Sequence, residues 1–172
     1  MSTIVSNPYS HINAVSQNHR NACWAACLEF WAKAVNNNNS ITQHTLRNEA
    51  GIKACYEHDS ETNTNLNDST DDGYGKMEAW ELLWLMRQPR WGMQVAQFTR
   101  MSSKKLKKKL QNGPVFIGFY DLSGNTWHVN VICGYDSTLK MVSVMEPRSG
   151  QFEDKSYSEF IDYSAFNIVG WK

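Results

Sequence analysis

The sequence predicts an α+β fold, a single domain over residues 1–172 in which N-terminal helices pack on a C-terminal antiparallel sheet. A length of 172 residues suits one domain with its own hydrophobic core. Before Gly113-Pro114, apolar residues recur every three to four positions in several segments. Short apolar and β-branched runs follow that dipeptide, and helices followed by strands are typical of the α+β class.

The first helix is expected after a polar, extended leader at residues 1–16. Asn21 suits the N-cap because its side chain can accept a hydrogen bond from the first helical turn. The apolar stripe of this helix consists of Cys27, Phe30, Trp31 and Ala34. The asparagines at 36–39 end the helix, since asparagine competes for backbone hydrogen bonds.

Two helices and a long loop are expected in the middle of the chain. A short helix covers residues 42–50 and is closed by Gly51. Residues 56–75 are rich in Asn, Asp, Ser and Thr, which predicts a polar surface loop. Another helix fits residues 76–87, because Pro89 prevents its extension. Its inward-facing side chains are expected to be Met77, Trp80, Leu83 and Trp84.

A further helix begins near Ser102 or Ser103 and ends at residues 112–114. Its lysines lie within residues 104–109 and have two interpretations, a surface for nucleic acid or membrane, or a solvated helix face. The net charge of the chain is zero and no aromatic residues are interleaved, which favours the solvated face. We therefore expect neither nucleic acid nor a membrane as partner.

Four strands are expected after Pro114, each rich in β-branched or aromatic residues. They cover residues 115–120, 127–133, 141–146 and 166–171.

The N-terminus has neither the basic start nor the apolar run of a secretory signal, and no segment approaches the roughly 20 apolar residues of a membrane span. We expect a monomer that is made in the cytoplasm, with secretion or delivery into a target cell left open. The four cysteines are too scattered for a disulfide scaffold and are expected to be free thiols. Cys23 and Cys27 form only half of a zinc site, so no metal and no cofactor are expected.

Cys23 is the candidate nucleophile. A cysteine attacks as the thiolate, and the first turn of a helix favours that anion through its unpaired N–H groups. Cys23 stands in that turn, whereas Cys27 lies a full turn further along the apolar stripe. Thioester chemistry also needs donors for the oxyanion, and Gln17 can reach it from the approach to the helix. The alternative for Cys23 is a buried structural thiol.

His128 is the candidate base because it opens a β-branched run, and a rigid strand holds a catalytic imidazole well. The other histidines occupy polar or surface segments and are His11, His19, His44 and His58. A five-residue loop centred on Ser137 would place His128 directly opposite Glu146. A carboxylate there can orient the imidazole, although a slip of one residue would send the two side chains to opposite faces. The alternative for His128 is a satisfied structural histidine.

The six-residue separation of Gln17 and Cys23 resembles that of the papain-like cysteine peptidases. The resemblance extends to the bacterial branch that includes bacteriocin-leader peptidases and effector proteases of plant pathogens. That branch has an Ala-rich helix after the cysteine, a Gly-Pro before a central strand, a His strand ending in Gly-Tyr-Asp, and an acid before Pro. The matching elements here begin at Cys23, Gly113, His128 and Glu146. The family more often has Asp or Asn as the third triad member.

The resemblance implies a cysteine protease that acts through a Cys23–His128–Glu146 triad, with Gln17 in the oxyanion hole. It further implies a protein or peptide substrate, a role as bacterial effector or toxin, and an immunity or inhibitor protein as partner. The same apparatus serves deamidases, peptidoglycan amidases and acyltransferases. A catalytically inactive protein-binding module is the alternative of another class.

Overall fold

Helices precede a sheet in the observed chain, which confirms the predicted α+β class. The structure is a computed structural model that describes residues 6–18, 21–49, 77, 79–97, 101–121, 126–158 and 168–172. Its helices are α1 (Cys23–Asn36), α2 (Gln43–Arg47), α4 (Ala79–Met86), α5 (Ser103–Leu110) and the 3-10 turn η1 (Pro89–Trp91). Its strands are β1 (Gln94–Ala96), β2 (Val115–Asp121), β3 (Thr126–Asp136), β4 (Met141–Glu146), β5 (Gln151–Ser156) and β6 (Ile168–Trp171).

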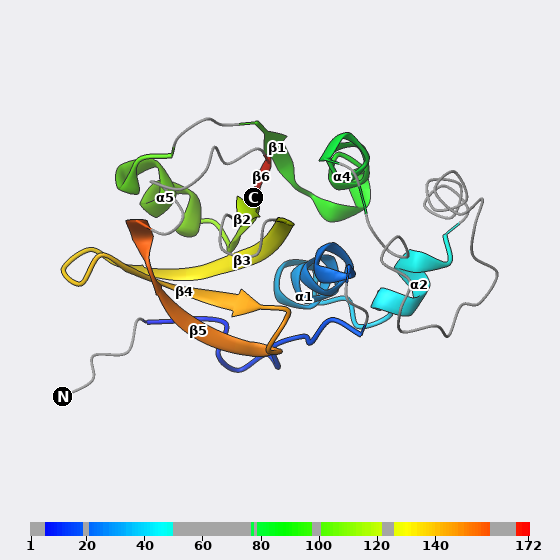
Figure 1. The fold of residues 1–172 in the computed structure, drawn as a ribbon, viewed down its shortest axis with the longest axis horizontal. Coiled ribbons are helices and arrows are strands. Elements are labelled where there is room, and N and C mark those ends of the chain that lie inside the picture. The colour runs from blue at the N-terminus through cyan, green and yellow to red at the C-terminus, as the bar shows by residue number, and fades with distance from the viewer. Residues whose placement is uncertain are drawn as a thin grey trace.

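The described strands form one antiparallel sheet in the order β1-β6-β2-β3-β4-β5. Side chains alternate between its two faces, because successive residues of a strand point in opposite directions. On β3, Val129 and Val131 pack in the core cluster that contains α1, whereas Ile132 packs in the cluster that contains Leu106 of α5. Helices α1 and α5 therefore cover opposite faces of the sheet (Figure 1).

The first helix starts at a different residue from the one expected. Ala22, not Asn21, occupies the N-cap of α1, and no side chain caps that position. Ala22 is fully buried, so packing determines where the chain enters the helix. Asn37 ends α1 in the left-handed conformation, as the run of asparagines predicts. In the leader, hydrogen bonds from Ser10 N to Asn7 O and from Ile12 N to Tyr9 O form turns that interrupt the expected extended chain.

The prediction of the inward face of α4 is wrong for its two tryptophans, whereas Met77, just before the helix, packs against the core as expected. Trp80 and Trp84 are 67% and 54% exposed, and Leu83 is buried as predicted. The rest of the buried face consists of Glu81, Leu82, Leu85 and Met86. Every residue of α4 except Glu81 is apolar, so periodicity could not identify which side faces the core. The expected loop at 56–75 lies outside the described residues.

Strands β3 and β4 pair in a different register from the expected one. The turn between them has four residues, because Asp136 pairs with Met141. A bulge at Cys133 then shifts the register by one residue, and the ladder ends at the pair Val131–Met145. If the ladder continued without the bulge, His128 and Glu146 would point to opposite faces.

With the bulge, both side chains point to the same face of the sheet. The register beyond it places Asn130 opposite Glu146, so that His128 lies diagonally across from the carboxylate. The expected register was therefore wrong by two residues, and an even error leaves side chains on the predicted face.

Candidate active site

The candidate nucleophile Cys23 is the first residue of α1 and is partly exposed. Burial of its sulfur raises the thiol pKa to about 11, although hydrogen bonds from the backbone of Val129 and Trp24 and the positive charge of Arg148 oppose the rise. The first turn of the helix does not by itself bring the pKa of Cys23 to neutral values. Desolvation outweighs the helix terminus, so ionisation requires a base that takes the proton.

Cys27 differs from Cys23 in its exposure and in its place on the helix. It is fully buried, and its Sγ donates a hydrogen bond to Val129 O at 3.5 Å. Burial raises its pKa well above the usual value. These contacts support the assignment of Cys27 as a structural thiol. Cys133 is also free and buried, whereas Cys55 lies outside the described residues.

The imidazole of His128 is held by a carboxylate from the next strand. His128 is 3% exposed and Glu146 is 5% exposed, and His128 Nε2 lies 2.7 Å from Glu146 Oε1. The ring also packs edge-to-face on Phe119, with centroids 5.7 Å apart. The structure thus brings together the two residues that the sequence proposes as base and orienting acid.

Glu146 has partners beyond the histidine. Asn130 Nδ2 and Lys155 Nζ donate to Oε2 at 3.0 and 2.6 Å, and the Arg148 N–H donates to Oε1 at 3.1 Å. Burial alone would raise the carboxyl pKa, but the contacts with His128, Lys155 and the Arg148 backbone hold it well below its usual value. Because an ionised carboxylate only accepts hydrogen bonds, Nε2 of His128 carries the proton and Nδ1 is available as base.

Sequence reasoning missed the partners of Glu146 other than His128, and the charged side chain among them is Lys155. It lies on β5, a strand that the sequence did not predict because the segment Gln151–Ser156 is polar and contains no β-branched residue. A lysine two residues after a glutamate, as in Glu153 and Lys155, is common on protein surfaces and does not identify a functional residue in a sequence. The β4–β5 pairing, which no local signal indicates, places Lys155 opposite Val142 on the same face as Glu146, and the long side chain reaches the carboxylate.

A backbone hydrogen bond holds Gln17 beside the end of β4. Its N–H donates to Pro147 O at 2.7 Å, which joins the approach to α1 to the turn that follows Glu146. The turn comes close to this segment at Gly150, where an added Cβ would lie 2.6 Å from the Cβ of Ser16. Gly150 also has φ +65°, so both space and conformation require glycine.

A buried glutamine clamps the segment on both sides of Gln17. Gln43 Nε2 donates to Ser16 O at 2.8 Å, and Gln43 Oε1 accepts from Asn18 N at 3.0 Å. Glu29 accepts from Gln43 N at 2.8 Å and from Lys33 Nζ at 2.6 Å. This network fixes the backbone that carries Gln17 relative to α1.

Among the described residues, no other histidine and no metal-binding cluster forms a second candidate site. His11 and His44 are exposed, and His19 and His58 lie outside the described residues. Within the described part of the chain, no group of three His, Cys, Asp or Glu side chains is arranged to hold a metal ion. No described helix is long and apolar enough to cross a bilayer.

Known proteins resemble this chain in sequence pattern and in fold. A model of the Peptidase_C39 like family matches residues 9–168. A similar solved structure is the peptidase domain of Streptococcus ComA, described as a bi-functional ABC transporter involved in a quorum sensing pathway. The TM-score is 0.60 at 15% identity, and the match covers 94% of this chain and 97% of that chain. No curated protein matches the chain. The fold is thus that of a papain-like cysteine peptidase domain, which confirms the resemblance read from the sequence.

Proposed function

Because the chain belongs to the Peptidase_C39 like family, we propose that it is a cysteine protease that hydrolyses peptide bonds through Cys23, His128 and Glu146. The observation that carries the proposal is the buried pair of His128 and Glu146, whose Nε2 and Oε1 atoms lie 2.7 Å apart. The residue after His128 on β3, Val129, contacts the sulfur of Cys23 through its backbone. Acyl transfer needs a thiol and an imidazole that an ionised carboxylate orients, and Val129 connects the strand of this pair to the thiol.

In the first step Nδ1 of His128 takes the thiol proton of Cys23, and the thiolate attacks the carbonyl carbon of the substrate. The tetrahedral oxyanion is stabilised by the Cys23 N–H and the Gln17 side-chain amide. The imidazolium then protonates the leaving amine, and an acyl-enzyme thioester forms. In the second step His128 activates water, which releases the acyl group and restores the thiol.

The longer side chain of a glutamate suits this site. Directly opposed residues of an antiparallel pair have Cβ atoms about 5 Å apart, whereas diagonal neighbours are about 7–8 Å apart. Glu146 reaches His128 diagonally, because Asn130 takes the opposite position. The extra methylene relative to aspartate spans this diagonal, which accounts for the departure from the family's usual third residue.

The proposal is tested by incubating the wild-type chain and Cys23→Ala with a pool of peptides and sequencing the products by mass spectrometry. A peptidase yields new peptide termini that Cys23→Ala does not produce. A deamidase or an acyltransferase leaves the peptide chain intact and changes a side chain instead. Turnover by Cys23→Ala equal to wild type would refute the assignment, and an inactive binding module would give no products with either chain.

The effector or toxin role, a target-cell destination and an inhibitor partner are proposed on the resemblance alone. Expression of the wild-type chain inside a candidate target cell is expected to impair growth, and Cys23→Ala is expected to be harmless. Equal effects of the two chains would contradict a toxin that acts through its protease activity.

A further inference from the structure

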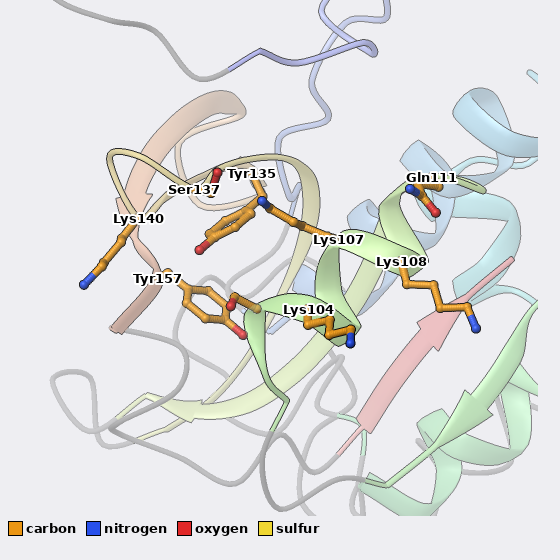
Figure 2. A pocket seen from close by; sticks show the side chains of 9 residues that line it. Lys104, Lys107, Lys108, Gln111, Tyr135, Ser137, Lys140 and Tyr157 are labelled. Carbon is orange, nitrogen blue, oxygen red and sulfur yellow. The ribbon is translucent and has the colours of Figure 1, made fainter.

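A cavity of about 630 Å³ lies between α5 and the turn that joins β3 to β4 (Figure 2). Its lysines come from both sides, Lys104, Lys107 and Lys108 from α5 and Lys140 from the turn. Tyr135 and Tyr157 lie between them. The cavity is separate from the candidate active site, because Cys23, His128, Glu146 and Gln17 do not line it.

The lining of the cavity is positively charged and rich in donors. None of its nine residues is acidic. Within the described part of the chain, its four lysines form no ion pair with a carboxylate. The adjacent Asp136 turns its Oδ1 toward the N–H groups of Thr138 and Leu139, at 2.7 and 2.9 Å. That carboxylate is held by the turn and, among the described residues, forms no ion pair with any of the four lysines.

Two features of the lysine-rich segments around the cavity are unfavourable for the fold, one on α5 and one in the β3–β4 turn. On α5, burial together with repulsion from Lys105 and Lys108 lowers the pKa of Lys109 to about 8, so positive charge is crowded on this helix. Lys140 has φ +53°, a left-handed conformation that favours glycine or asparagine. A lysine at that position is unfavourable for the backbone, and its side chain lines the cavity.

We propose that this cavity binds a small molecule carrying a chain of phosphate groups, which Lys107 contacts beside Tyr135 and toward which the side chain of Lys140 turns when the ligand binds (Figure 2). The volume lies within the range of about 300–1,000 Å³ that is typical of small-molecule sites. Lysine ammonium groups bind phosphate as point charges. A net charge of zero leaves the chain without the overall positive field that attracts nucleic acid.

The ligand would tie α5 to the β3–β4 turn. Lys107 Nζ lies 5.5 Å from the centre of the Tyr135 ring, so a phosphate bound by Lys107 lies close to an aromatic side chain. A free polyphosphate and a nucleotide share the phosphate chain, and only the nucleotide adds a base that can contact the tyrosines.

The test is isothermal calorimetry of the wild-type chain with tripolyphosphate, a nucleoside triphosphate and citrate, without divalent cations and at physiological ionic strength. Tripolyphosphate is expected to bind with one-to-one stoichiometry and more tightly than citrate. Tighter binding of the nucleoside triphosphate assigns the site to a nucleotide, and equal binding assigns it to the phosphate chain. Cys23→Ala is expected to bind like wild type, so failure of the proposed protease function would leave this result unchanged.

Matched variants locate the site. Lys107→Gln is expected to weaken tripolyphosphate binding by about three- to tenfold, whereas Arg87→Gln, which removes the same charge after α4, leaves it unchanged. Lys140→Gly is expected to weaken binding while raising or preserving Tm, because glycine relieves the left-handed backbone.

Three results would overturn the proposal: no tripolyphosphate binding, equal weakening by Arg87→Gln, or citrate binding as tight as tripolyphosphate. Displacement of tripolyphosphate by a DNA duplex at equal phosphate concentration would assign α5 to a nucleic-acid surface instead.

Discussion

Two cysteines one turn apart on α1 contact the same residue of the sheet in opposite ways. Cys27 donates to the carbonyl of Val129, whereas the sulfur of Cys23 accepts from the Val129 backbone. Burial raises the pKa of both thiols. Cys23 differs in its partial exposure and in its place at the first residue of the helix. The comparison shows that a helix start alone does not activate a thiol, and that the base must be supplied by the sheet.

The largest expected difference in peptidase activity is between the variants Cys23→Ala and Cys27→Ala. Cys23→Ala should abolish peptide hydrolysis, because it removes the sulfur that attacks the substrate carbonyl in the proposed mechanism. Cys27→Ala should keep activity and lose about 1 kcal/mol of unfolding free energy, because it leaves a small cavity in the core. Peptide cleavage and urea unfolding of the two variants measure this. Loss of turnover in a stably folded Cys27→Ala would break the comparison.

The second test asks whether the base comes from His128. In His128→Ala the alkylation rate of Cys23 by iodoacetamide should rise about tenfold per pH unit toward the thiol pKa of about 11, because only the thiolate reacts. In wild type, transfer of the proton to the imidazole should keep Cys23 reactive at mildly acidic pH, with Cys27 and Cys133 spared. Identical pH profiles for the two chains would show that the imidazole does not ionise the thiol.

The residues of this pair could be predicted from the sequence, but their geometry could not. Cys23 stands at the start of α1, which the apolar stripe of that helix predicts to within one residue, and His128 lies near the start of β3, which its β-branched run predicts. The bulge at Cys133 has no local signal, yet it decides the face to which His128 points. The short strand β1 and the polar strand β5 were missed because their pairing depends on neighbours far along the chain.

Removal of the oxyanion donor Gln17 is a further test of the difference between Cys23 and Cys27, because this donor stabilises only the intermediate that forms on Cys23. Gln17→Ala should reduce kcat by about a hundred- to a thousandfold through loss of one hydrogen bond to the oxyanion. Asn18→Ala is the matched control on the same segment, because the backbone N–H of Asn18 that Gln43 holds is retained. Similar losses in both variants would mean that the segment acts through its fold and not through the Gln17 amide.

Removal of the positive charge of Lys155, which contacts Glu146, should reduce activity less than removal of Gln17. Lys155→Met removes the 2.6 Å contact to Glu146 and keeps the aliphatic stem, so activity should fall by about tenfold as the carboxylate is held less firmly. Glu153→Gln, which changes the other carboxylate near Lys155, should leave activity unchanged. Equal effects of the two variants would assign Lys155 to general surface charge.

The same variant carries a pH prediction. The folded pKa of Glu146 lies below its ordinary value of 4.5, so its ionisation stabilises the fold at neutral pH, and this contribution is lost as pH falls below about 4.5. Lys155→Met should raise the folded pKa and reduce the acid-dependent part of the stability. Urea unfolding at neutral and acidic pH should show the stability difference between wild type and variant shrinking as pH falls.

The smallest expected effect concerns the clamp that holds the Gln17 segment. Gln43→Ala removes the hydrogen bonds to Ser16 O and Asn18 N, so kcat should fall by about three- to tenfold with KM unchanged, because the oxyanion donor is placed less accurately. Thr42→Ala is the control on the same helix, since loss of this N-cap costs about 1 kcal/mol without touching the clamp.

A double-mutant cycle decides whether Gln43 acts through Gln17. If it does, Gln43→Ala should reduce kcat in the wild-type background and have almost no further effect in the Gln17→Ala background, because the donor that it positions is already gone. Additive losses would show that the clamp supports another part of the site. In that case Gln17 would be positioned by the hydrogen bond of its N–H to Pro147 O and by the close packing of Gly150 on Ser16. Gln43 of α2 would then have no part in placing the oxyanion donor for Cys23.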